Sequence, residues 1–264
     1  KGFLIGATSG RTTLNGEGLQ HQDGHSHILS STIPNCLSYD PAYAYEVAVI
    51  VKDGIQKMYV EQENYFYYIT TINENYLHPE MPKGCEEGII KGMYRIRSVD
   101  KPKVRLLGSG AILNEAIKAL EILKKYEIDA EIWSVTSFNL LRKNGMETER
   151  FNQLNPLEDK KLTYVEECFI DNDIPTIAAT DYMRTYAEQI RPYITSQYAT
   201  LGTDGYGRSD SRETLRDFFE VNAKSIARSS IYLLFQEKCL SKDEVEKIYK
   251  DLKIDPKKPN PWQI

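Results

Sequence analysis

Long apolar runs are missing from this 264-residue sequence. The longest candidate, at residues 44–51, is interrupted by Glu46 and followed by Lys52. Because a membrane-spanning helix needs about 20 consecutive apolar residues, the sequence predicts no membrane segment. The four cysteines lie far apart and form no CxxC pair, which argues against a zinc knuckle and a disulfide framework. Unpaired thiols are typical of a reducing compartment, so we expect a cytoplasmic protein.

A strong excess of either charge is also missing. The 33 Lys and Arg residues nearly balance the 38 Asp and Glu residues, so nothing points to nucleic acid or an anionic membrane as a partner. The first residues contain neither an initiator methionine nor a signal-peptide pattern, and we expect the chain to be part of a longer protein. Tyrosine is abundant instead. Its 18 residues suit large internal interfaces in which each hydroxyl finds a partner.

Patterns typical of strands and helices alternate along most of the chain, which predicts an α/β fold with a mostly parallel sheet covered on both faces. A proline-bearing connector at residues 73–83 is the best candidate for a domain boundary, dividing the chain into residues 1–83 and 84–264. The predicted strands are 33–39, 65–71, 104–107, 130–135, 176–179 and 198–201. The predicted helices are 43–58, 112–126, 138–153 with an interruption at Gly145, 183–190, 212–219, 223–239 and 242–252.

Residues 10–27, called the histidine loop below, concentrate the groups capable of chemistry. Three of the four histidines, His21, His25 and His27, lie close together in this loop with Asp23. Histidine exchanges protons near neutrality because its unperturbed pKa is about 6.5. Residues 10–18, at the start of the loop, add hydroxyl groups, an amide and a guanidinium without much bulk. The pattern favours a functional site over a solvated loop.

A metal site is the sharpest competing interpretation from the residues alone, since imidazole and carboxylate suit zinc or iron. The three histidines and Asp23 alternate along the chain, so on a strand they would share one face. However, Gly24 disfavours a regular strand, and no Cys or Glu of suitable spacing follows. We therefore expect no metal ligand in this loop.

Other motifs carry weaker signals. Residues 108–110 follow a predicted strand as a phosphate-binding turn would, but a third glycine and a Lys-Ser/Thr pair are missing, so a tight turn is the better interpretation. Residues 204–210 fail as a calcium loop because a tyrosine and an arginine stand where oxygen ligands are needed. Cys36 and Cys85 have no neighbouring base, which predicts buried thiols.

Taken together, these residues resemble the active-site loop of homodimeric pyruvate dehydrogenase decarboxylating subunits. The match consists of the run GRTTLNGEGLQH at 10–21 and the run DGHSH at 23–27. The resemblance extends from the first residue to the last. Further matching segments are 34–36, 38–46, 68–71, 73–76, 107–110, 134–138, 201–205 and 207–213.

The resemblance implies a transketolase-like fold. Residues 1–83 would be the C-terminal half of a thiamine-diphosphate (pyrimidine-binding) domain, and residues 84–264 a transketolase C-terminal-like doubly wound domain. The family's activating glutamate and its Gly-Asp-Gly motif for magnesium and diphosphate are not found in this sequence. We therefore expect thiamine diphosphate and magnesium in the full-length enzyme, without tight cofactor binding or activity of this chain alone.

The reaction implied by the resemblance is decarboxylation of pyruvate and transfer of the acetyl group to a lipoyl domain. The enzyme would be a homodimer bound to a dihydrolipoamide acetyltransferase core. The segment from Asp23 to His27 matches the Asp-Gly-x-x-His element of transketolases. On that match, His27 and Asp23 are the expected catalytic residues. His27 would face the substituent on the thiazolium ring and act in proton transfers, and Asp23 would position the loop or interact with the cofactor side of the site. His25 and His21 are expected to bind substrate, as orienting partners or as groups that face the lipoyl chain.

Two other functions stay open. A transketolase-like enzyme acting on sugar phosphates would need basic residues in the loop, and only Arg11 is present there. Residues 84–264 contain no obvious catalytic constellation. Taken alone, they are best described as a non-catalytic dimerisation and docking module of the complex.

Overall fold

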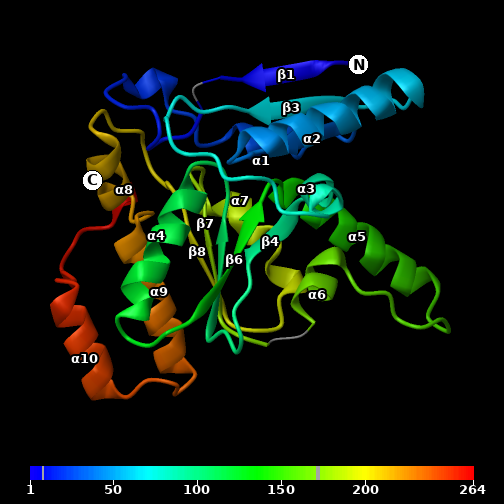
Figure 1. The fold of residues 1–264 in the computed structure, drawn as a ribbon. Coiled ribbons are helices and arrows are strands. Elements are labelled where there is room, and N and C mark those ends of the chain that lie inside the picture. Colours follow the sequence, from blue (N-terminus) through cyan, green and yellow to red (C-terminus); the bar gives the residue numbers. More distant parts are fainter. Residues whose placement is uncertain (8, 171–172) are drawn as a thin grey trace.

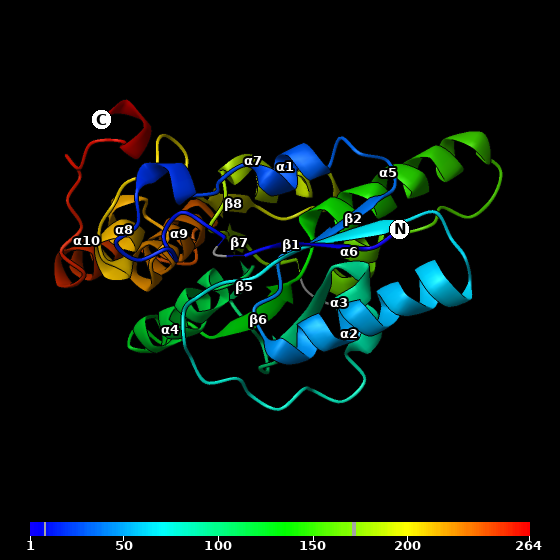
Figure 2. The same ribbon diagram turned by 90° about the horizontal axis from the view of Figure 1, so that it is seen from above.

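A three-stranded parallel sheet forms the first unit of the chain (Figure 1). The computed structural model describes residues 1–7, 9–170 and 173–264. The strands of this sheet, in the spatial order β1-β3-β2, are β1 (Phe3–Gly6), β3 (Phe66–Thr70) and β2 (Cys36–Tyr39). Helices α1 (Ser26–Ser30) and α2 (Ala44–Ile55) lie on opposite sides of it, as Figure 2 shows from above.

A five-stranded sheet forms the second unit, and among its strands only β4 runs antiparallel to its neighbour. Its strands, in spatial order, are β4 (Met93–Arg97), β6 (Ala130–Val135), β5 (Val104–Gly108), β7 (Thr176–Ala179) and β8 (Tyr198–Leu201). Its helices are α3 (Glu86–Lys91), α4 (Ile112–Lys124), α5 (Phe138–Leu154), α6 (Tyr164–Phe169), α7 (Arg184–Glu188), α8 (Arg212–Phe218), α9 (Ala223–Gln236) and α10 (Lys242–Asp251).

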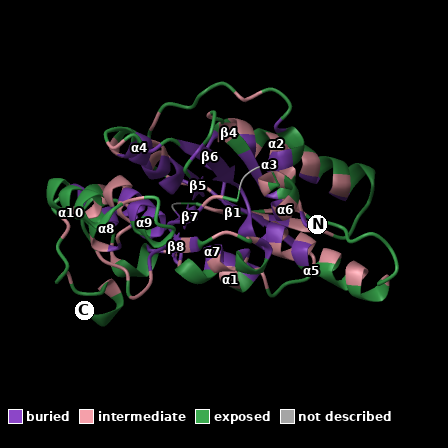
Figure 3. Ribbon diagram, turned by 90° about the horizontal axis from the view of Figure 1, so that it is seen from below, coloured by how far each residue is buried: buried purple, intermediate pink, exposed green. Residues whose placement is uncertain are grey.

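Helices cover both faces of the five-stranded sheet, which confirms the predicted fold class. Helices α4, α8, α9 and α10 contribute to the apolar core on one face, and α5, α6 and α7 to the core on the other. The strands between them are buried along their whole length at β5, β6 and β7 (Figure 3). Strands buried on both faces form continuous apolar runs rather than alternating patterns, which explains why the sequence indicated them clearly.

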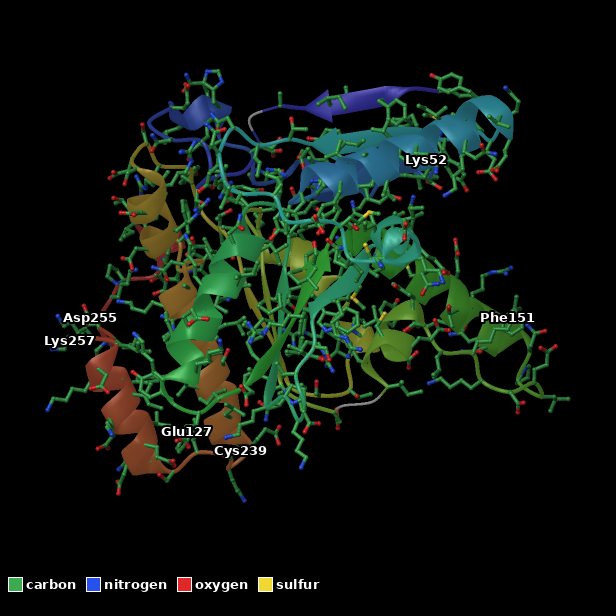
Figure 4. All side chains as sticks on the ribbon, in the orientation of Figure 1. Lys52, Glu127, Phe151, Cys239, Asp255 and Lys257 are labelled. Atoms are coloured by element: carbon green, nitrogen blue, oxygen red, sulfur yellow. The ribbon has the colours of Figure 1, made fainter. Side chains whose placement is uncertain are left out.

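The apolar core of the first unit extends past the connector. Ile50, Tyr67 and Ile69 are fully buried in it, and Cys85 and Ile89 from the start of α3 pack into the same cluster. The predicted boundary at residue 83 therefore lies just before a helix that packs on the first unit. The thiols of Cys36 and Cys85 are buried, as the sequence predicts, whereas Cys239 (labelled in Figure 4) is exposed.

Several predicted elements differ from the observed ones. The sequence predicts an interruption of α5 at Gly145, whereas the helix is continuous there. A side chain at Gly145 would overlap the ring of Tyr193, so glycine serves close packing at this position. Strand β2 begins only at Cys36, three residues later than predicted. The short helices α1, α3 and α6 and strand β4 have no counterpart among the predicted elements.

Glu46 of α2 joins the two units. Its carboxylate is fully buried and accepts hydrogen bonds from the backbone N–H groups of Ala42 (2.5 Å) and Tyr43 (2.9 Å). It also accepts bonds from the hydroxyls of Tyr94 (2.7 Å) and Ser134 (2.6 Å) in the second unit. Burial raises the pKa of Glu46, and these four bonds act in the opposite direction. A buried carboxylate is stable only where donors satisfy it, so this site fixes how α2 meets the second sheet.

Replacing Glu46 with alanine is expected to lower the free energy of unfolding by about 3 kcal/mol, because four buried donors lose their acceptor. The Glu46→Gln variant keeps one acceptor oxygen and is expected to lose about half as much. Urea unfolding followed by circular dichroism measures both. The control is Glu121→Ala, which removes an exposed ion pair with Lys124 and should cost less than about 1 kcal/mol. Equal midpoints for Glu46→Ala and Glu121→Ala would contradict the role of Glu46.

Candidate active-site loop

The histidine loop has a buried part at residues 11–13, called its root, and an exposed part around His21 and His25, called its tip. The side chains of Arg11, Thr12 and Thr13 are buried, whereas His21 and His25 are exposed. Residues Leu19–His21 form a single 3-10 turn, and the loop ends in the short helix α1. The loop therefore has fixed anchors on one side and two imidazoles open to solvent on the other.

Asp181, which follows β7 in the second unit, holds the root of the loop. Its Oδ1 accepts hydrogen bonds from the backbone N–H (2.9 Å) and the hydroxyl (2.6 Å) of Thr12. Its Oδ2 accepts the same pair from Thr13, at 3.1 and 2.6 Å. A side chain at Gly10, whose φ is +88°, would overlap the Asp181 carboxylate, so glycine is required for this close approach. Burial raises the pKa of Asp181, while Arg216 and the threonine donors act in the opposite direction.

Arg11 connects this root to the exposed tip. Its Nη1 donates to the carbonyl oxygens of Thr203 and Gly205, which follow β8. Its Nη2 lies 3.3 Å from Nε2 of His25. Since a guanidinium can only donate, Nε2 of His25 is the acceptor in this contact and the ring proton resides on Nδ1. Arg11 therefore holds Nε2 of His25 and favours the tautomer that carries the proton on Nδ1.

Asp23 and Gln22 form hydrogen bonds that hold the backbone of the tip in place. Asp23 Oδ1 accepts hydrogen bonds from the backbone N–H groups of His25 (3.0 Å) and Ser26 (2.9 Å), and its Oδ2 accepts the Ser26 hydroxyl. A carboxylate in this position stabilises the start of α1. Gln22 forms a pair of hydrogen bonds with the backbone of Arg208, accepting from its N–H at 2.7 Å and donating to its carbonyl oxygen.

His27 lies behind the tip, in an aromatic enclosure. Its side chain is fully buried, and its Nε2 is 3.0 Å from the hydroxyl of Thr70. The imidazole stacks on Tyr186 at 4.8 Å between centroids and meets the edge of Tyr182 at 4.6 Å. Burial lowers the pKa of His27 to about 3, so the ring is neutral at physiological pH. Its expected role in contacting substrate stays a prediction, and the geometry of this chain supports a role in packing and orientation.

Asp40 continues the polar chain behind His27. The hydroxyl of Thr70 donates to Asp40 Oδ1 at 2.8 Å, and the backbone N–H of Gly110 donates to the Asp40 carbonyl oxygen at 3.1 Å. A side chain at Gly110 would overlap the carboxylate. Residues 108–110 thus form a tight turn, and the Asp40 carboxylate lies directly against it. Burial raises the pKa of Asp40 to about 7.

The structure brings together Asp23, His25 and Arg11, places His21 at the open tip, and separates His27 from them by burial. Sequence reasoning missed Asp181, although a polar residue directly after a buried parallel strand is a usable signal of a site at the carboxyl edge of a sheet. Within the described ranges, no three His, Cys, Asp or Glu side chains come together as a metal site would require. In the same residues no helix is both long and apolar enough to cross a membrane.

Two family models match the chain in succession. The Pyruvate dehydrogenase E1 component middle domain matches residues 1–79, and the Transketolase-like TK C-terminal domain matches residues 92–222. Curated pyruvate dehydrogenase E1 components from Buchnera aphidicola (subsp. Acyrthosiphon pisum) and Escherichia coli (strain K12) are 58% and 54% identical over 99% of the chain. The chain belongs to the pyruvate dehydrogenase E1 component family. This confirms the family that the histidine loop resembles.

The chain spans about 30% of the length of these E1 relatives. A middle-domain match followed by a C-terminal-domain match corresponds to the C-terminal part of the family's proteins. Solved transketolases from Pichia stipitis (a mutant) and Campylobacter jejuni superpose with TM-scores of 0.65 and 0.64, covering 89% and 87% of this chain and 30% and 31% of their own. Both are 16% identical to it, so they establish the transketolase-like fold alone.

The raised pKa of Asp40 predicts a pH dependence of stability in this E1 chain. An ordinary Asp has a pKa of about 3.9, so the folded state binds the Asp40 proton more tightly than the unfolded state. Its contribution to stability is fully present below about pH 4 and is lost as the pH rises towards about 7. Relative to Asp40→Asn, the wild type should therefore lose up to about 1.4 kcal/mol per pH unit in this window.

Urea unfolding of both proteins between pH 4 and pH 8 measures the difference, because other titrating groups are common to the two. Asp159→Asn, a change at an exposed loop residue, is the control and should follow the wild-type profile. Parallel profiles for Asp40→Asn and wild type would contradict the assignment.

Proposed function

We propose that this chain supplies one wall of the active site in a thiamine-diphosphate-dependent pyruvate dehydrogenase. That enzyme would decarboxylate pyruvate and pass the acetyl group to a lipoyl domain. The observation that carries the proposal is the exposed histidine tip held on a buried polar root, with Nε2 of His25 in contact with the Arg11 guanidinium. The identity to proteins named pyruvate dehydrogenase E1 component, 54% and 58% over nearly the whole chain, supports this reaction class.

The residues present do not fit the diphosphate and metal of the cofactor. The described residues contain no cluster of side chains for a metal ion. The glycine turn at 108–110, where a phosphate would be sought, faces the carboxylate of Asp40 instead. We therefore assign the cofactor to other parts of the longer protein, and we expect this chain alone to release no carbon dioxide from pyruvate.

Within this proposal the two exposed imidazoles face the substrates. His21 and His25 are open to solvent, and the Nδ1–H of His25 is free to donate to a carboxylate or a hydroxyl because its Nε2 is held by Arg11. Asp23 is a positioning residue that fixes the backbone of His25. His27 orients the loop from behind through Thr70 and the two tyrosine rings.

The open edge of β1 supports the assignment to a longer protein. Strand β1 is the outer strand of its sheet, and its Leu4 and Ile5 side chains are about half exposed, at 58% and 50%. An apolar edge strand of this kind needs a covering partner. We propose that further strands of the same protein cover it, and that the homodimer and the acetyltransferase core are assembled by the longer protein.

A sugar-phosphate substrate of the transketolase type is less well supported. Such a substrate needs exposed cations, whereas the guanidinium of Arg11 is buried and already donates to two carbonyl oxygens. The exposed tip carries imidazoles and one carboxylate instead. This argues against a phosphate-bearing substrate, and the choice of pyruvate rests on the identity to the E1 relatives.

The histidines can be tested one at a time in the full-length enzyme. His21→Ala and His25→Ala are expected to lower the rate of acetyl transfer to a lipoyl domain by about 10²-fold, as for loss of a positioned proton donor. Their melting temperatures should stay close to wild type, because both side chains are exposed. His27→Ala is expected to lower both the rate and the melting temperature, because it empties a buried enclosure.

Thiamine diphosphate binding, measured by titration, should be unchanged in all three variants. Unchanged transfer rates in both His21→Ala and His25→Ala would overturn the proposed role of the exposed tip. A His27→Ala enzyme of native stability with no transfer activity would instead establish that His27 itself reaches the substrate. The control is His78→Ala, on the connector away from the histidine loop.

A further inference from the structure

The order of strands in the second unit defines a place where a ligand would be expected. From β5 the chain passes to β6 on one side, and it then returns to β7 on the other side of β5. In doubly wound sheets, ligands bind outside the carboxyl ends of the strands at this change of direction. Here the segments that follow β5 and β7 are residues 109–110 and 180–181.

This crevice holds a segment of the same chain. The carboxylate of Asp181 receives all four hydrogen bonds that the backbone N–H groups and hydroxyls of Thr12 and Thr13 can donate. The Asp181 carbonyl oxygen accepts two more, from the N–H of Arg11 (3.3 Å) and the hydroxyl of Thr203 (2.8 Å). All the side chains concerned are buried, so water does not compete for these bonds.

Arg216 of α8 completes the site. Its Nε lies 3.4 Å from the hydroxyl oxygen of Thr12, and its guanidinium forms ion pairs with Glu74 and Glu115. The cation balances part of the buried negative charge beside Asp181. The second unit therefore contributes both a carboxylate and a cation to hold the root of the histidine loop.

We propose that Asp181 is a positioning residue for the reaction, and that the second unit acts by binding the histidine loop in its own ligand crevice. Arg11 directly precedes Thr12, so anchoring Thr12 and Thr13 fixes the backbone from which Arg11 reaches His25. The part that concerns the reaction rests on the proposed function. The anchoring of the loop does not, and it can be measured separately.

The test uses the full-length protein with Thr12→Val, Thr13→Val and the double variant. Valine has the shape of threonine without the hydroxyl, so each change removes one bond to Asp181 and keeps the backbone bond. Asp181 itself is left intact, because its removal would leave buried donors and a buried cation unsatisfied. Thr12→Ser and Thr13→Ser restore the hydroxyl. Thr176→Val is the matched control, a buried threonine at the opposite end of β7 whose hydroxyl also forms hydrogen bonds.

Two quantities are measured, namely hydrogen exchange of the backbone amides in residues 9–27 and the kcat and KM of acetyl transfer to a lipoyl domain. Loss of each hydroxyl is expected to raise exchange in the loop about tenfold, as for loss of one hydrogen bond to a charged group. We expect kcat to fall by a similar factor with little change in KM, because the loop loses its orientation. The serine variants and Thr176→Val are expected to match the wild type in both quantities.

Unchanged exchange in the double valine variant would overturn the anchoring itself. Raised exchange with unchanged kcat would overturn the positioning role and leave the contact purely structural. If the wild-type enzyme failed to act on pyruvate, the proposed function would fail, while the exchange measurement would still decide whether Asp181 anchors the loop.

Discussion

The buried carboxylate of Asp181 is the interaction on which the rest of the histidine loop depends. A carboxylate without water requires donors that satisfy it in full, and two consecutive threonines supply four of them. This requirement fixes the path of the chain at Thr12 and Thr13, and glycine at position 10 allows the approach. Glu46 imposes the same condition at a second contact between the units. The relative position of the two units is therefore set by polar geometry rather than by apolar contact alone.

The histidines of one short loop lie in different physical environments. His27 is buried among aromatic rings, and burial alone accounts for its low pKa. A perturbed pKa often marks a catalytic group, yet here it marks a residue that no solvent reaches. His25, in contrast, is exposed, and its Nε2 contacts the guanidinium of Arg11. Exposure and the partner that each ring meets therefore describe the difference between these two histidines better than the size of a pKa shift does.

The sequence predicted those features of the fold that local residue patterns determine, above all the buried strands. Apolar runs at β5, β6 and β7 are long enough to indicate a parallel sheet. Strand β4 was missed because only its first two residues are buried and two of the other three are arginines, so it has no apolar run. The anchoring of the loop was missed because Thr12 and Asp181 lie 169 residues apart. Burial of His27 depends in the same way on Tyr182 and Tyr186, rings whose approach no local pattern records. The family resemblance identified the loop, but only the fold separates its histidines into buried and exposed ones.

The chemistry of the crevice explains why it holds a loop rather than an anionic ligand. A phosphate or dinucleotide site at this position offers glycine-rich backbone donors at a helix N-terminus. This chain offers acceptors instead, since Asp181 follows β7 and the carboxylate of Asp40 lies against the turn after β5. Acceptors of that kind suit hydroxyl and N–H donors, which are the groups that Thr12 and Thr13 present. The five-stranded sheet thus keeps the strand order of a ligand-binding fold. At the point where that order changes direction it presents hydrogen-bond acceptors in place of donors, and a segment of the same chain supplies the matching donors.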